Sequence, residues 1–294
     1  MDTLDFPARG GHHGSQIAPE TAPQQHDCGP GAPAAAFAGT DMSRYELLDN
    51  VTHQDLRVST LLGTGIDDPV GLVPAWPTEF AELQREYPIF LRRDEADGSF
   101  QAVALLGFDA GENLFIGPDG WNTSYLPGAV ARGPFAIGFQ EQLQGGMLQN
   151  EPVIHVDVDH PRVARDGDGT PVFLPHGGHS PYLEHVLTVL KGIHDGAEAA
   201  RALYPALDAL GLIQPVELDL QFDQEHHARL TGLYGIDRDR LAALDAQQLH
   251  GLHTSGMLEG IYLMLCSMYN VRHMIAEKQR RLRAQAGAEA GRAG

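Results

Sequence analysis

The chain has 294 residues, of which 43% are hydrophobic and 20% are charged. This composition lies near the globular average and excludes a wholly disordered chain, a collagen and a coiled-coil rod. Lys and Arg number 20 and Asp and Glu number 39, so the net charge is −19. Such a charge repels nucleic-acid phosphate and anionic lipid, and we expect neither as a partner. The only two cysteines, Cys28 and Cys266, exclude a disulfide framework and a cysteine-rich zinc site.

The two ends of the chain differ in composition from its body. Residues 1–42 are rich in Pro, Gly and Ala and hold few large aliphatic side chains, so they bury too little apolar surface to offset their ordering entropy. We predict a disordered tail over 1–42, a single domain over 43–283 and a frayed C-terminal tail over 284–294. The N-terminus shows no basic start followed by an apolar run, and no window reaches the roughly 18 uninterrupted apolar residues of a membrane span. We therefore expect a cytoplasmic protein with free thiols and no membrane insertion.

The first half of the body reads mainly as strands. A short helix is predicted over 79–86, and Pro88 must end it. Strands are predicted at 88–92, 100–108, 113–117, 134–140 and 153–159, and the first two are joined by a turn at 94–98. In the last of these strands Ile154, Val156 and Val158 alternate with His155, Asp157 and Asp159. We expect the first set to face the core and the second set to be largely solvent-facing.

In the second half of the body the spacing of apolar residues changes to that of a helix. Ser180 and Pro181 form a strong helix start, and apolar residues then recur every three or four positions until Gly211, with Pro205 expected to kink or split the helix. Strands are predicted at 216–222 and 229–236, a short helix at 245–253 and a long helix from 256 to about 283. This order favours an α+β fold with a mainly antiparallel sheet packed by two or three long helices in the C-terminal half.

One loop is a candidate binding site. Trp121, Asn122 and Tyr125 lie in a segment framed by Gly120 and Pro127. Aromatic side chains in such a loop either fill the core or form a binding surface. Both interpretations stay open at this point.

The sharpest chemical pattern is His155-Val156-Asp157. A His-x-Asp pair on a strand with a distant His is the ligand set of non-haem iron oxygenases, and His226 or His227 could supply the third ligand. Two features argue against this hypothesis. The helix over 180–210 interrupts what should be a continuous double-stranded β-helix, and Asp157 also suits a strand end before a turn.

Several segments together resemble the SapC-like family, which is linked by name to surface-array (S-layer) proteins. Their order and spacing over residues 43–275 make the match specific, and residues 1–42 fall outside it. The matching stretches are 73–74, 79–80, 86–90, 104–108, 111–115, 120–121, 125–127, 134–135, 181–183, 211–213, 232–244 and 253–262. The family pattern has an Asp at the position of Asp157 but usually no His at that of His155, which weakens the iron hypothesis further.

The resemblance implies a bacterial accessory protein connected with the cell surface. It carries no catalytic residues over to this chain. We therefore expect a non-enzymatic binding protein without a cofactor, which assists an S-layer or outer-membrane protein or an enzyme that modifies it. The alternative is the iron-dependent oxygenase-like enzyme. A third interpretation is a scaffold that forms a homodimer through its apolar C-terminal helix, whose stripe comprises Leu258, Ile261, Leu265 and Met268.

Overall fold

The computed structural model describes residues 44–62, 71–109, 111–118, 120–144, 147–164 and 167–293. These residues belong to one compact unit that spans residues 43–294. All strand pairs between the described residues are antiparallel, and the long helices lie in the C-terminal half. The predicted α+β class is confirmed. The segment 1–42, predicted to be a disordered tail, lies outside the described residues.

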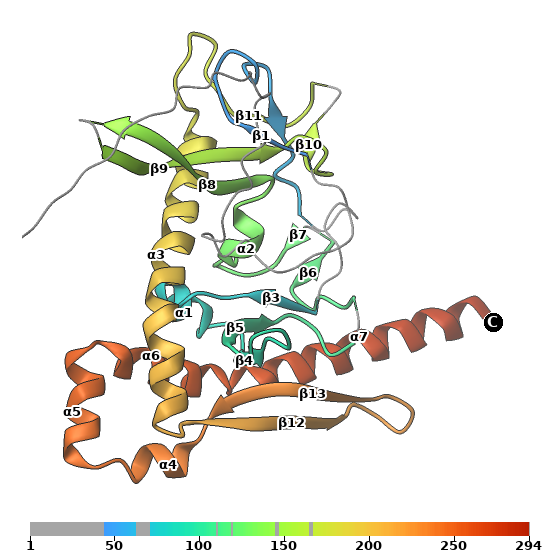
Figure 1. Cartoon of the computed structure of the whole chain (residues 1–294). Coiled ribbons are helices and arrows are strands. Elements are labelled where there is room, and N and C mark those ends of the chain that lie inside the picture. The colour runs from blue at the N-terminus through green and yellow to red at the C-terminus, as the bar shows by residue number, and fades with distance from the viewer. Residues whose placement is uncertain are drawn as a thin grey trace, which may run out of the picture. The chain divides into compact units, whose positions relative to one another are not determined.

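The largest sheet has five strands in the order β12-β13-β4-β5-β3 (Figure 1). Along that order the strands are Ile213–Gln221, His227–Ile236, Ile89–Arg93, Phe100–Leu105 and Leu72–Pro74. Pro215 lies on β12, where a missing N–H is tolerated because β12 is an edge strand. Only Leu233 and Tyr234 of β13 pair with β4, so most of the β12–β13 hairpin extends past its neighbours.

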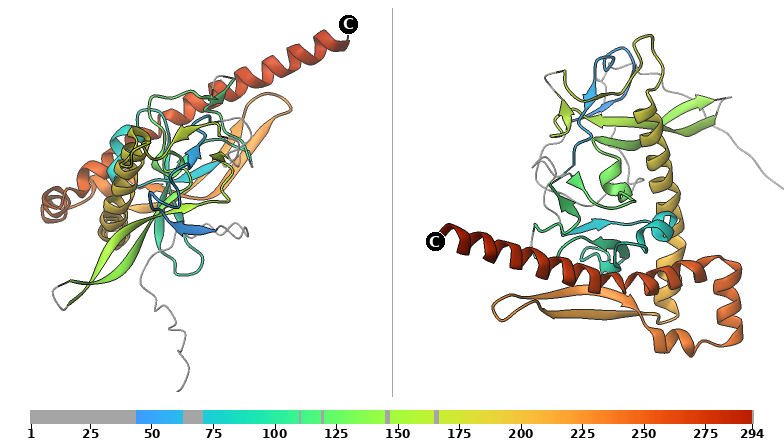
Figure 2. Two further views of the ribbon diagram at one scale, coloured as in Figure 1. Left: turned by 90° about the horizontal axis from the view of Figure 1, so that it is seen from above. Right: turned by 180° about the vertical axis from the view of Figure 1, so that it is seen from behind.

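The two faces of this sheet bury separate clusters of apolar side chains, because successive residues of a strand point to opposite faces. Leu91 belongs to a cluster with Phe80, which begins α1 (Phe80–Leu83), and with Ile261 of α6 (Met257–Ser267). Phe90 belongs to the other cluster, which includes Met274 of α7 (Asn270–Ala293). Figures 1 and 2 show α7 running along the β12–β13 hairpin.

A second sheet has three strands in the order β1-β9-β8. Its strands are Tyr45–Leu47, Met147–Asp157 and Phe135–Gln144. Phe135 and Val156 are fully buried and pack with Leu183 and Val186 of α3 (Pro181–Ala209). Two small sheets complete the strand inventory of the described residues: β10-β2-β11 (Val163–Ala164, Arg57–Val58, Thr170–Pro171) and β6-β7 (Ile116–Gly117, Gly120–Trp121).

Helix α3 (Pro181–Ala209) packs against both the cluster around Phe80 and the cluster around Phe135. Its start is capped as predicted, since the Ser180 hydroxyl accepts a hydrogen bond from Leu183 N at 3.2 Å. Its C-terminal half buries Leu203 and Leu207 in the cluster around Phe80. The helix is not split at Pro205, because this packing on both sides of the proline holds it together. Gly211, with φ +67°, follows its end.

The remaining helices are η1 (Pro77–Glu79), α2 (Gly128–Ala131), α4 (Arg238–Ala242), α5 (Ala246–Thr254), α6 (Met257–Ser267) and α7 (Asn270–Ala293). The helix predicted from 256 to 283 is therefore two helices. At the junction the buried Asn270 side chain donates to the carbonyls of Gln84, at 2.8 Å, and Tyr87, at 3.2 Å. Helix α7 continues to Ala293, through the segment predicted to fray.

Candidate functional site

A buried carboxylate lies at the end of η1. Glu79 is 7% exposed. Its Oε1 accepts a hydrogen bond from Trp76 N at 3.1 Å, and its Oε2 accepts from Gly128 N and the Tyr125 hydroxyl, both at 2.8 Å. Burial raises the pKa of the Glu79 carboxyl, and the three hydrogen bonds oppose that rise. Glycine at 128 permits this approach, since a Cβ there would lie 3.3 Å from Oε2.

A buried tyrosine hydroxyl lies in the same cluster. Tyr87 has no exposed surface. Its hydroxyl donates to the Tyr125 carbonyl at 2.7 Å, accepts from Trp121 Nε1 at 2.8 Å and lies 2.6 Å from the Thr123 hydroxyl. Burial raises the pKa of Tyr87 to about 12. We call Glu79, Tyr87, Trp121, Thr123 and Tyr125 the Glu79–Tyr87 cluster.

The Glu79–Tyr87 cluster contains two of the three residues of the candidate binding loop. Trp121 and Tyr125 are half-buried, and both pack against the core around Phe80. Asn122 is exposed. Of the two interpretations of this loop, the packing therefore favours a core role for both aromatic side chains. Glu79 and Tyr87 were not singled out from the sequence, because nothing in the spacing of 79, 87 and 121–125 shows that they meet.

The structure does not bring the proposed iron ligands together. His155 and Asp157 lie on β9, whereas His226 lies in the β12–β13 turn, where its Nδ1 is 2.9 Å from Asp223 Oδ1. The neighbouring His227 begins β13 in the same hairpin. Among the described residues no group of three or more His, Cys, Asp or Glu side chains is placed to hold a metal ion. The donor set therefore does not fit iron.

The prediction of a solvent-facing His155, Asp157 and Asp159 is wrong at Asp157. This residue is 6% exposed, whereas His155 is half-buried and Asp159 exposed. Strand β1 pairs with this end of β9, with Tyr45 opposite Asp157. Asp157 Oδ1 also accepts from Asp159 N at 3.1 Å, so the carboxylate shapes the turn that leaves the strand.

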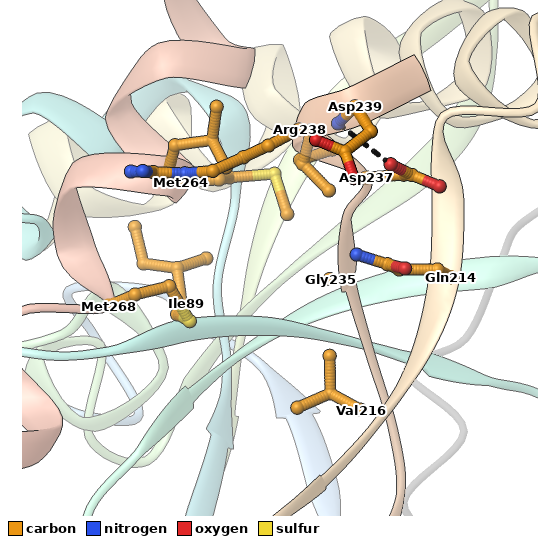
Figure 3. Close-up of a pocket in the computed structure, with 11 residues that line it drawn as sticks. Ile89, Gln214, Val216, Gly235, Asp237, Arg238, Asp239, Met264 and Met268 are labelled. Atoms are coloured by element: carbon orange, nitrogen blue, oxygen red, sulfur yellow. Dashed lines mark hydrogen bonds between the residues drawn. The ribbon is translucent and has the colours of Figure 1, made fainter. Parts of the chain in front are cut away.

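A pocket with a volume of about 540 Å³ lies between β12, β13 and α6. We call it the β12–α6 pocket. Its floor is apolar, and Figure 3 shows Ile89, Met264 and Met268 facing Val216 across it. Ile89 and Met264 are 1% exposed, so the floor is also part of the core. This volume falls within the roughly 300–1,000 Å³ of typical ligand pockets.

The rim of the β12–α6 pocket is polar. Gln214, Asp237, Arg238 and Asp239 border it, and three of them are exposed while Asp237 is half-buried. Asp237 Oδ1 caps α4 by accepting from Asp239 N and Arg240 N, both at 2.9 Å. The pocket therefore offers an apolar floor beside two carboxylates and one guanidinium. The pocket was not predicted from the sequence, because its residues come from four separate segments.

The apolar stripe of the C-terminal helix, from which a homodimer was predicted, packs against other parts of the same chain. Ile261 has no exposed surface, and Leu265 is 8% exposed. Both pack in the core around Phe80, and Leu265 and Met268 also line the β12–α6 pocket.

In the described part of the chain no helix is long and apolar enough to cross a membrane.

Comparison with known proteins gives one result that classifies the chain. No curated protein and no solved structure matches it. The model of the family described as SapC matches residues 48–274. That match covers most of the chain and nearly all of the elements described above, so the chain belongs to the SapC family.

Proposed function

We propose that this chain is a non-enzymatic accessory protein that binds a protein partner in the β12–α6 pocket. The partner is a bacterial cell-surface protein or an enzyme that modifies it, as the family resemblance implies. Binding happens in the cytoplasm, before the surface protein is exported.

The observation that carries this proposal is the apolar floor of the pocket. Met264 and Met268 contribute flexible, polarisable side chains, and methionine adapts its shape to different apolar groups. Of the floor residues, Val216 and Met268 are half-buried and can be covered by an apolar side chain of a partner segment, whereas Ile89 and Met264 are 1% exposed. A floor of this kind favours binding over group transfer, since it presents no nucleophile or base to a bound group.

The charges at the rim indicate what lies next to that apolar side chain. Two carboxylates, Asp237 and Asp239, and one guanidinium, Arg238, border the pocket, and the whole chain carries a net charge of −19. Electrostatic complementarity steers association with a basic segment. We therefore expect a partner segment with a large apolar residue beside Lys or Arg.

Site-specific photocrosslinking in the source cell tests the proposal. A photoreactive residue replaces Gln214, which is exposed at the rim, and in a matched control it replaces Glu225, which is exposed in the β12–β13 turn. We expect one partner to be captured at position 214, not captured at 225, and lost when Asp239→Lys is added. Capture that is equal at both positions, or that persists with Asp239→Lys, would contradict the proposal.

Two further measurements complete the test. The captured segment, made as a peptide, should bind the purified full chain in calorimetry, and Asp239→Lys should weaken it about tenfold while changing the free energy of unfolding by no more than about 0.5 kcal/mol. Metal analysis addresses the enzyme alternative. Stoichiometric iron that disappears in His155→Ala would refute a non-enzymatic function.

A further inference from the structure

Arg162 is a buried cation without a carboxylate beside it. It lies in the turn that precedes β10 and is 4% exposed. Its Nε donates to the Ser59 carbonyl and its Nη1 donates to the Val130 carbonyl, both at 3.0 Å. Among the described residues Arg162 forms no ion pair, although the buried Asp157 is close to it in sequence. Because a charge removed from water is costly without an opposite charge, an anion that binds next to this guanidinium gains free energy.

A second polar group near Arg162 is unpaired. The hydroxyl of Tyr182, in the first turn of α3, is buried and has no hydrogen-bond partner in the part of the chain that the structure describes. The Tyr182 ring packs near that of Phe135, with 6.3 Å between the ring centroids. Burial raises the pKa of Tyr182, and the positive charge of Arg162 opposes that rise. The hydroxyl therefore stays protonated near neutral pH and can donate a hydrogen bond.

Gly133 leaves a space between these two groups. It lies between α2 and β8, is half-buried and has φ +55°, a conformation that favours glycine. A Cβ at this position would lie 3.4 Å from the Tyr182 hydroxyl and 3.6 Å from Arg162 Nη1, so a methyl-sized group fits there without a clash. The hydroxyl and the guanidinium therefore border one small space, which reaches solvent because Gly133 is partly exposed.

We propose that Arg162, Tyr182 and Gly133 form a binding site for the carboxylate of a small organic acid. We call it the Arg162–Tyr182 site. The guanidinium supplies the positive charge and a donor, and the hydroxyl supplies a second donor, so together they match the two oxygens of one carboxylate. Phosphate also pairs with arginine, but its further oxygens need more donors than these two groups provide. The size of the space, which a single methyl group would fill, limits the ligand to a small acid.

The Arg162–Tyr182 site is separate from the β12–α6 pocket. None of its three residues lines that pocket, and Tyr182 packs instead in the apolar cluster around Phe135. Binding of an acid at the site and binding of a partner in the pocket can therefore be tested independently. The failure of one would not imply the failure of the other.

Thermal unfolding of the full chain in sodium acetate tests the site, with sodium chloride at the same ionic strength as the reference. A ligand that binds only the folded chain raises the melting temperature, whereas both salts screen the net charge of −19 equally. Tyr182→Phe should melt within about 2 °C of the wild type without acetate and bind acetate at least about fivefold more weakly. Tyr262→Phe, at an exposed tyrosine, is the matched control and should leave the affinity unchanged. No rise over chloride in the wild type, or an unchanged affinity in Tyr182→Phe, would overturn the proposal.

Two glycine variants test the space. Gly133→Ala places a methyl group between the hydroxyl and the guanidinium and should abolish the rise caused by acetate. Gly232→Ala is the matched control, because its φ of +73° imposes a similar backbone strain while its Cβ would meet no other residue within 4 Å. Sodium phosphate at the same ionic strength should raise the melting temperature no more than chloride does. A rise that persists in Gly133→Ala, or an equal rise with phosphate, would refute a carboxylate site.

Discussion

The Glu79–Tyr87 cluster and the β12–α6 pocket lie against the same core, yet they treat polar groups in opposite ways. In the cluster, Glu79 is buried and its carboxylate accepts three hydrogen bonds. At the pocket, the exposed Asp239 borders a floor of apolar side chains. The polar groups of the cluster form hydrogen bonds with one another and with the backbone. At the pocket, the Asp239 carboxylate is exposed and the apolar Val216 and Met268 are only half-buried.

This difference separates a structural role from a binding role. A buried polar group is costly unless it is paired, and the pairs made by Glu79 fix the 121–127 loop and the start of α2 on the core. An apolar surface beside unpaired charge gains free energy only when something covers it. We therefore assign support to the cluster and recognition to the pocket. The four predictions below test that assignment, beginning with the largest expected effect.

The largest effect is expected from Glu79→Ala. The change leaves Trp76 N, Gly128 N and the Tyr125 hydroxyl without their acceptor, which should lower the free energy of unfolding by about 3–5 kcal/mol. Chemical denaturation measures it. Glu79→Gln is the control, since its amide oxygen keeps one acceptor, and it should cost about half as much. A loss below about 1 kcal/mol for Glu79→Ala would show that the cluster does not support the fold.

A smaller loss is expected from Trp121→Ala. The indole is half-buried against the core and donates to Tyr87, so its removal should cost about 2–4 kcal/mol. The folded variant should still bind the partner peptide with wild-type affinity, because Trp121 does not line the β12–α6 pocket. Unchanged stability together with lost binding would instead make the 120–127 loop the binding surface.

Two tyrosines offer a matched pair. The Tyr125 hydroxyl donates to Glu79, whereas the Tyr182 hydroxyl is buried without a hydrogen-bond partner among the described residues. Tyr125→Phe should cost about 1–2 kcal/mol, and Tyr182→Phe should change the free energy of unfolding by less than about 0.5 kcal/mol. Equal losses in the two variants would mean that the bond to Glu79 contributes nothing.

The smallest effect is a pH dependence. Because burial raises the pKa of Glu79, the folded chain holds the Glu79 proton over a range in which the unfolded chain has lost it. The stability that this group contributes is fully present below its ordinary pKa and is lost as the pH rises through the raised pKa. The difference in unfolding free energy between wild type and Glu79→Gln should therefore change in favour of the variant as the pH rises. A difference that is constant with pH would contradict the raised pKa.

The sequence predicted the elements whose signals are local. The Ser180-Pro181 start of α3 and its end before Gly211 were correct, because a helix cap and a left-handed glycine act within a few residues. Strand β12 was predicted because Val216, Leu218 and Leu220 alternate with polar residues. The α+β class followed from the order of such segments, and the family was recognised from the order of short motifs.

The errors lie where distant segments meet. The long C-terminal helix divides before Asn270 because that side chain bonds to carbonyls at Gln84 and Tyr87, which are far away in sequence. Asp157 is buried at the end of β9 where β1, from a distant part of the chain, pairs with it. Neither contact leaves a local pattern, so neither could be predicted from periodicity.

The sequence by itself determined the class of the fold, the positions of its main helices and strands, and the family to which the chain belongs, because caps, turns and alternation are decided by neighbouring residues. Only the tertiary structure decided what the side chains do. It placed Tyr125 on a buried carboxylate and Trp121 on a buried tyrosine hydroxyl, separated His155 from His226 and left a pocket between β12 and α6. The physical reason is that hydrogen bonds and apolar contacts depend on distance in space, which the linear order of residues does not record.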